Sequence, residues 1–214
     1  MMRTILDTTA NPAHDAFVEK KSEFIGDAAH VDSLDEALAF VERVRQAHPK
    51  SRHVAYAAVC GGADGQVSER MSDDGEPSGT AGKPILDVLR ANDLTDCVVA
   101  VTRYFGGVLL GSGGLIRAYS TGASIAVKAA RMAAIVPCRR YLVALDYAQL
   151  RQFQRILASV DGSQSDEEYA ADVTLVASMP QERCERFEEM VRETFNATVV
   201  PEPLDMVNRA VEMD

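Results

Sequence analysis

The sequence reads RYFGGVLLGSGGLIRAY from Arg103 to Tyr119, and this stretch organises the rest of the chain. An apolar run at 97–102 precedes it and predicts a buried strand, and an Ala-rich segment at 115–131 predicts a long helix after it. The stretch contains five glycines, which a folded chain carries where the backbone needs a positive φ or approaches another group closely. A glycine-rich connection from a strand to a helix N-terminus presents backbone N–H groups and the positive end of the helix dipole, and both suit an anion.

The glycine-rich stretch is therefore a candidate site for RNA phosphate, a nucleotide or another anion. Two arginines bracket it, and a guanidinium group can bind anionic oxygens in pairs. The predicted binding residues of this stretch are Arg103, Gly106, Gly107, Gly111, Ser112, Gly113, Gly114 and Arg117. The stretch lacks the Gly-Lys-Ser/Thr sequence of a Walker-type loop. The alternative is a tight strand-to-helix connection that packs under a neighbouring loop and binds nothing.

A second loop reads SDDGEPSGTAGKP from Ser72 to Pro84, and its glycines, prolines and acids exclude a regular element. Pro84 suits the first turn of a following helix. The predicted binding residues of this loop are Asp73, Glu76, Thr80 and Lys83, and Asp74 and Glu76 are the acid/base candidates if the protein is an enzyme. The alternative is that the acids shape the loop through turns, helix caps and ion pairs. We hypothesise that the two loops face each other across one cleft, because both lie at strand-to-helix entries of one α/β layer.

Residues outside these two loops give weaker signals. Lys20 and Lys21 form either a solvated charge pair or an RNA contact, and His53 reads as a structural, partly buried histidine. Tyr104 belongs either to the core or to a stacking face for a base. Spacing defines no Ser-His-Asp or Cys-His catalytic arrangement.

The pattern of elements predicts two α+β domains, with a boundary near residue 135. The first domain, 1–135, carries both loops, a polar start at 1–23, and a helix at 33–48 that opens with a Ser33-x-x-Glu36 capping box. The second domain, 136–214, reads β-α-β-β-α-β, which is the ferredoxin-like order. Its last strand is predicted at 198–200, and the tail after Pro203 is predicted to be loose.

Composition is that of an ordinary globular protein of 214 residues, with 47% hydrophobic and 25% charged residues. The net charge of −10 argues against a broad electrostatic face for duplex nucleic acid. Residues 1–135 carry 14 basic and 17 acidic residues and 136–214 carry 8 and 15, so a local basic patch belongs more naturally to the first domain. The four cysteines show no Cys-x-x-Cys pair, and no apolar run reaches the ~20 residues of a membrane helix. These features predict a reduced, cytoplasmic protein without a metal site, a cofactor or a membrane partner.

Three segments together resemble the YigZ/IMPACT family: Lys20–Phe24, Ser72–Pro84 and Arg103–Tyr119. The resemblance covers the whole chain and implies the fold of the second domain of ribosomal protein S five, followed by a ferredoxin-like domain similar to a late domain of elongation factor G. Eukaryotic IMPACT is a translation regulator that restrains an amino-acid-starvation kinase by competing for its activator, and it uses an additional N-terminal domain for this role. The family often reads His-x-Cys after the first helix, whereas this chain has Ala55 two residues after His53, so a catalytic cysteine is excluded there.

The sequence therefore favours a non-enzymatic, translation-associated protein that binds RNA phosphate or another anion in an N-terminal cleft. Its predicted partner is RNA or a ribosome-associated component, and the resemblance supplies that context. The alternative is an enzyme acting on a phosphorylated or peptide-like small substrate in the same cleft. The sequence does not define the oligomeric state of the protein.

Overall fold

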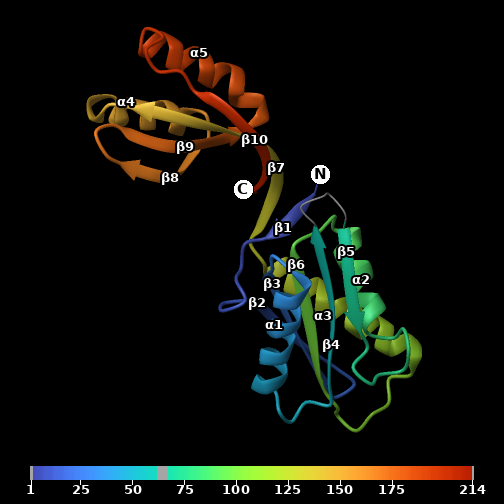
Figure 1. The fold of residues 1–214 in the computed structure, drawn as a ribbon. Coiled ribbons are helices and arrows are strands. Elements are labelled where there is room, and N and C mark those ends of the chain that lie inside the picture. The colour runs from blue at the N-terminus through green and yellow to red at the C-terminus, as the bar shows by residue number, and fades with distance from the viewer. Residues whose placement is uncertain (1, 62–66, 214) are drawn as a thin grey trace. The chain divides into compact units, whose positions relative to one another are not determined.

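The computed structural model describes residues 2–61 and 67–213. The chain forms two compact units, one of Met1–Ile135 with Ala210–Asp214 and the other of Val136–Arg209 (Figure 1). The last residues of the chain thus group with the first unit, although the sequence assigns all of 136–214 to the second domain. Each unit is described by itself below.

The first unit is built on an antiparallel five-stranded sheet in the order β2-β3-β6-β4-β5. Its strands are β1 (Arg3–Ile5), β2 (Ala13–Glu19), β3 (Ser22–His30), β4 (His53–Gly61), β5 (Val67–Ser72) and β6 (Cys97–Tyr104). Its helices are α1 (Leu34–Ala47), α2 (Gly82–Ala91) and α3 (Ser112–Ala129). Strand β1 lies outside the five-stranded sheet and pairs with β7 (Met132–Leu145).

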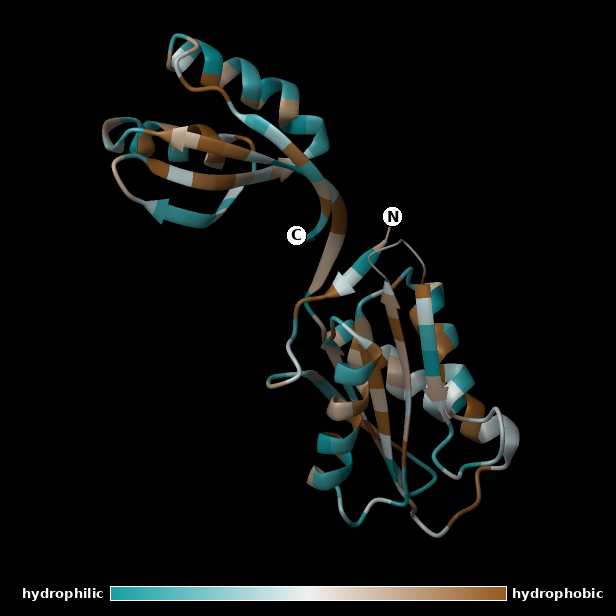
Figure 2. Ribbon diagram, in the orientation of Figure 1, coloured by the Kyte–Doolittle hydropathy of each residue, from teal (hydrophilic) through white to brown (hydrophobic). Residues whose placement is uncertain are grey.

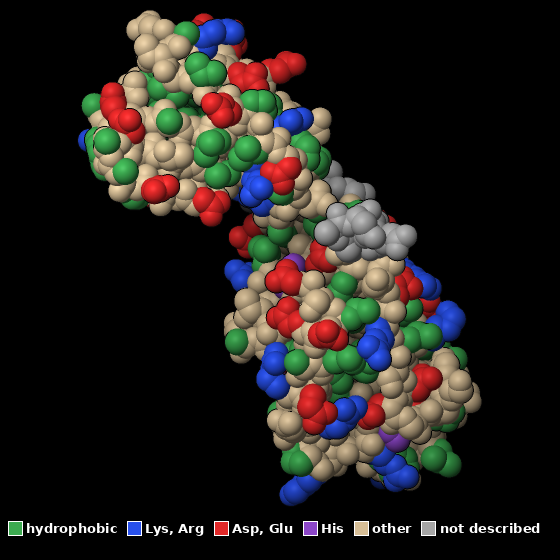
Figure 3. Space-filling view, viewed as in Figure 1, with side chains coloured by type: hydrophobic (Ala, Val, Ile, Leu, Met, Phe, Trp, Pro, Cys, Tyr) green, Lys and Arg blue, Asp and Glu red, His purple; other side chains and the backbone are tan. Residues whose placement is uncertain are grey.

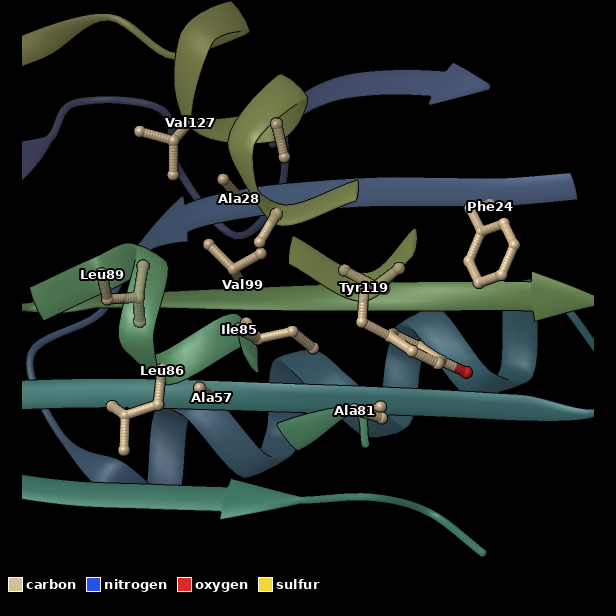
Figure 4. Close-up of a cluster of buried hydrophobic side chains, with 14 of the residues drawn as sticks. Phe24, Ala28, Ala57, Ala81, Ile85, Leu86, Leu89, Val99, Tyr119 and Val127 are labelled. Carbon is tan, nitrogen blue, oxygen red and sulfur yellow. The ribbon is translucent and has the colours of Figure 1, made fainter. Parts of the chain in front are cut away.

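Side chains of the central strand β6 point alternately to the two faces of this sheet, which explains why helices cover both faces. Val98 and Ala100 pack in one core cluster with α1, whereas Val99 and Val101 pack in another with α2 and α3. Successive side chains of a strand point to opposite faces, so β6, which is apolar at every position from 97 to 101, requires cover on both sides. Figure 2 shows the apolar colouring along β4 and β6, and Figure 4 shows side chains of the α2/α3 cluster.

Strand register places four connections of the first unit at one end of the sheet. Glu19 pairs with Ser22 across the β2–β3 hairpin, and Arg103 near the end of β6 pairs with both Phe24 and His53. The four connections are 20–21, 48–52, 73–81 and 105–111, and we call this region the loop end. All three segments that resemble the YigZ/IMPACT family reach it.

The second unit has the predicted β-α-β-β-α-β order, and this prediction is confirmed. Its elements are β7, α4 (Tyr147–Ser159), β8 (Ser163–Tyr169), β9 (Val173–Pro180), a 3₁₀ turn (Gln181–Arg183), α5 (Cys184–Thr194) and β10 (Glu202–Glu212). Strand β10 pairs with β7, which leads on to β9 and then β8. Asp146 and Gln149 form a capping box at the start of α4. The apolar faces of α4 and α5 pack with alternate residues of β7 and β9 around Phe153 and Phe187.

Two expectations from the sequence are wrong near the C-terminal end of the chain. Residues 198–200 form no strand, and the tail predicted to be loose instead forms β10. The polar start of the chain, for which the sequence predicts no element, contains β1 and β2. Strands β2 and β10 are largely exposed, so they lack the hydrophobic alternation that marks a strand, and pairing with a neighbour decides their conformation. The sequence GGADG at 61–65 also predicts a hairpin-type turn, and this turn falls mostly outside the described residues.

Candidate anion-binding site

Asp73 shapes its own loop. Its carboxylate accepts hydrogen bonds from the backbone N–H groups of Gly79, Ala81 and Gly82, at 2.8, 2.9 and 2.9 Å. Burial raises the pKa of Asp73, but the three backbone hydrogen bonds outweigh burial, and the pKa lies below its usual value. The carboxylate therefore fastens the loop to the start of α2.

Asp74 anchors the same loop to its neighbours. Its carboxylate accepts from the backbone N–H of Val54 at 2.6 Å and from Nη2 of Arg45 at 2.8 Å. Nδ1 of His53 donates to the carbonyl oxygen of Asp74 at 2.6 Å. This bond supports the structural role expected of His53, and Asp74 serves the loop-shaping alternative.

Glu76 meets Arg103 in the interior, so the two signature loops do come together. Oε1 of Glu76 accepts from Nη1 of Arg103 at 2.6 Å and from the Tyr119 hydroxyl at 2.9 Å, with Nε2 of His53 3.9 Å away. The Glu76 and Arg103 side chains are only 4% and 7% exposed. Burial, reinforced by the negative charge of Glu76, raises the pKa of Tyr119 far above its ordinary value. Figure 4 shows Tyr119 and Phe24 at the same end of this core.

This pairing changes the role expected of Arg103. The sequence suggests an anion clamp, but the guanidinium is already neutralised by Glu76. Its Cζ lies 5.6 Å from the ring centroid of Phe24 and 5.5 Å from that of Phe105. We conclude that Arg103 and Glu76 form a buried ion pair that ties the two loops together.

The backbone geometry explains why glycine is present at two positions of the glycine-rich stretch. A Cβ at Gly106 would overlap the backbone carbonyl of Lys21, and the Gly106 N–H donates to Ser22 Oγ at 3.2 Å. Gly111 is the N-cap of α3 and has a φ of 72°, in the region that favours glycine. The helix begins at Ser112, three residues before the expected start. The close approach at Gly106 fixes the β2–β3 hairpin tip against the glycine-rich stretch.

The hairpin tip and the start of α3 enclose a cavity of about 230 Å³. Lys20 and Arg117 line it, together with Glu19, Phe17, Leu110, Gly114, Ala118 and Thr121. Lys20 and Lys21 have backbone φ values of 47° and 65°, which residues other than glycine, asparagine and aspartate rarely adopt. Across residues 2–61 and 67–213, no hydrogen bond or ion pair of a described residue involves the Arg117 side chain. The sequence predicts Arg117 as a binding residue and leaves two interpretations of the lysines, a solvated charge pair or an RNA contact.

Other predicted binding residues have different surroundings. The Thr80 hydroxyl donates to the Pro77 carbonyl at 2.6 Å, and Lys83 pairs with Asp87 on the surface at 2.7 Å. Ser112, Gly113 and Gly114 form the first turn of α3, which contains no acidic residue and whose N-cap makes no side-chain hydrogen bond. Gly107 precedes that turn at a φ of 84°.

Two features of this end could have been found in the sequence but were missed. Residues 97–145 contain no Asp or Glu, so β6, the glycine-rich stretch and α3 carry only basic charges. Arg52 also reaches the loop end, where its Cζ lies 5.8 Å from the ring centroid of Phe105. Figure 3 shows basic side chains at this lower end of the first unit.

The described residues hold no group of three or more His, Cys, Asp or Glu side chains that could bind a metal ion. Among them, no helix has the length and apolar character needed to cross a membrane.

Comparison with known proteins decides the family. Residues 20–127 match the Impact N-terminal domain. The Escherichia coli (strain K12) protein described as IMPACT family member YigZ is 39% identical over 168 residues, covering 78% of this chain and 82% of that protein. The chain belongs to the IMPACT family. Residues 143–198 of this IMPACT family member match a domain of unknown function, DUF1949.

Other relatives extend the comparison. An IMPACT family member of Haemophilus influenzae is 35% identical over 187 residues, covering 87% of this chain and 91% of that one. A solved structure described as a hypothetical protein is 33% identical, with a TM-score of 0.64 over 95% of this chain and 97% of that one. The structure of the two-domain translational regulator Yih1 is 26% identical, with a TM-score of 0.38 over 56% of this chain and 47% of that one.

Proposed function

We propose that this IMPACT family member is a translation-associated regulatory protein that binds RNA phosphate at the loop end of its first unit. The association with translation is inferred from membership of the IMPACT family. One observation supports the binding surface: strand register brings Lys20, Lys21 and Arg52 to one end of a single sheet, where Arg117 lines the same cavity as Lys20.

The charge balance of the loop end supports this proposal. Its acids Asp73, Asp74 and Glu76 each accept hydrogen bonds from within the protein, so internal donors offset much of their charge. The lysines of the hairpin tip are exposed, as is Arg117. The first turn of α3 adds backbone N–H groups and the positive end of a helix of 18 residues. Phe105 is 39% exposed and can stack with a base.

The enzymatic alternative has weaker support from the same geometry. It assigns acid/base chemistry to Asp74 or Glu76, which need access to a substrate proton. Glu76 is buried against Arg103 and Tyr119, and Asp74 is held by Arg45 and the Val54 N–H. Neither carboxylate lines the cavity beside Arg117.

Changing Lys20 and Arg117 together to glutamine is expected to weaken RNA binding and flatten its salt dependence. Each lost phosphate contact on a single strand lowers the slope of log K against log salt by about 0.7, so the double variant should lose about 1.4. The measurement is fluorescence anisotropy of a labelled oligouridylate across a KCl series.

The matched control changes Arg70 and Lys128 to glutamine, since both are exposed basic residues of the first unit outside the loop end. This control should keep the slope of the unaltered protein. Equal loss in both double variants would mean that binding is diffuse. Absence of oligouridylate binding at low salt would contradict the proposal. If the protein binds inorganic phosphate but not oligouridylate, the loop end is an anion site and not an RNA site.

A further inference from the structure

A larger cavity, of about 440 Å³, lies on the other face of the first unit's sheet, beside α1. Phe40, Arg43, Val44 and Ala47 of α1 line it, with Asp27 of β3. Thr9, Ala10, Pro12 and His48 complete the wall. Its size lies within the range of small-molecule sites. His48 also belongs to a connection of the loop end, but none of the basic residues proposed to bind RNA (Lys20, Lys21, Arg52 and Arg117) lines this cavity.

Asp27 is the unusual group of this cavity. Its side chain is only 7% exposed. Nδ1 of His14 donates to its Oδ1 at 2.7 Å, but Oδ2 accepts no hydrogen bond from any described residue. A buried carboxylate oxygen without a donor is costly, so a native structure normally supplies one.

A second unpartnered oxygen lies on the same face. Asp27 pairs in register with Ala100 of β6, and Thr102 follows two residues along that strand, so its side chain points to the α1 side. Oγ1 of Thr102 is also buried and without a partner among the described residues. Thr102 does not line the cavity, so the case for a hydrogen-bonding guest there rests on Oδ2 of Asp27.

The remaining walls restrict the chemistry of that guest. Phe40, Val44 and Ala47 offer apolar surface. Arg43 adds a positive charge, with its Cζ 5.9 Å from the ring centroid of Phe40, and takes part in none of the ion pairs of the described residues. A simple cation would be repelled by Arg43, and a simple anion by Asp27. A zwitterion avoids both penalties.

We propose that this cavity binds a small zwitterion with an aliphatic body, the chemical class of an aliphatic α-amino acid. Its ammonium group donates to Oδ2 of Asp27, its carboxylate lies against Arg43, and its aliphatic part packs on Phe40 and Val44. The site is independent of the proposed RNA binding.

Isothermal titration calorimetry of the full chain with L-leucine tests this site. Asp27→Asn and Arg43→Gln should each weaken leucine binding by about tenfold or more, because each removes a charge-assisted contact. Asp15→Asn, an exposed change of the same kind on β2, should leave binding unchanged. N-acetyl-L-leucine lacks the ammonium and leucinamide lacks the carboxylate, so both should bind at least about tenfold more weakly than leucine.

Amide NMR shifts on adding leucine locate the site, and the largest should fall at Ala47 and His48. The chemically modified probes keep the test valid even if Asp27→Asn fails to fold. The proposal is overturned if leucine does not bind, which would mean that Oδ2 is satisfied by water, or if N-acetyl-L-leucine binds equally well. Arg70→Gln is the control for Arg43→Gln. If Arg43→Gln binds leucine as tightly as this control does, the proposed contact between Arg43 and the carboxylate is wrong, and so is the proposal of a zwitterionic ligand.

Discussion

Replacing Glu76 with glutamine is expected to lower the free energy of unfolding of the first unit by about 3–5 kcal/mol. The amide keeps the shape of the carboxylate but leaves the guanidinium of Arg103 buried without its counter-charge. A charge in that position pays the desolvation cost without the attraction that offsets it. The Tyr119 hydroxyl also loses a charged acceptor, since it donates to the same oxygen.

Urea unfolding followed by the amide NMR signals of β4 and β6 measures this effect in the first unit alone. The double change Glu76→Leu with Arg103→Met removes both charges and should recover much of the lost stability, because apolar groups can replace a buried pair at little cost. Lys83→Gln breaks an ion pair whose lysine side chain is 58% exposed, and it should alter stability little. A small effect of Glu76→Gln would show that the buried pair is not what ties the two loops together.

Replacing Gly106 with alanine should destabilise the first unit by about 1–3 kcal/mol, the usual range for overpacking. The added methyl group would overlap the backbone carbonyl of Lys21, which cannot rotate away as a side chain can. The β2–β3 hairpin tip must therefore move, and the hydrogen bond from Gly106 N–H to Ser22 Oγ must lengthen. Because that tip carries Lys20 and Lys21, oligouridylate binding should weaken as well.

Gly113→Ala is the matched control for Gly106→Ala. A Cβ at Gly113 would meet only the Arg117 guanidinium, at 3.7 Å. The position lies within α3, where alanine is favoured over glycine by about 1 kcal/mol, so this variant should be slightly more stable. Both are measured by urea unfolding and anisotropy. Equal stability of the two variants would contradict the assigned role of Gly106.

Much of the fold follows from patterns that the sequence displays. The Ser33 capping box and the apolar spacing behind it predict α1, and the cap is present with Ser33 Oγ accepting from the Glu36 N–H. The apolar run at 97–102 predicts β6. The hydrophobic pattern does not predict β2 and β10. Both strands are largely exposed, and an exposed strand is specified by the strand that it pairs with rather than by its own side chains.

The candidate site was harder to predict for a physical reason. Asp73, Asp74 and Glu76 are neighbours in sequence with similar chemistry, yet one binds backbone N–H groups, one binds Arg45, and one lies buried with Arg103. Only the tertiary structure decides which charges are offset internally. Asp27 gave no sequence signal at all, because its burial depends on the pairing of β3 with β2 and β6.

The division of the chain has a consequence for its synthesis. The first unit includes residues from Ala210 onward, and the Met213 N–H donates to the Met132 carbonyl at 3.0 Å. The second unit is thus encoded as an insertion within the first. A ribosome therefore releases residues 1–135 before the second unit, and these residues can begin to fold early. The segment from Ala210 joins them only after all of the second unit has been synthesised.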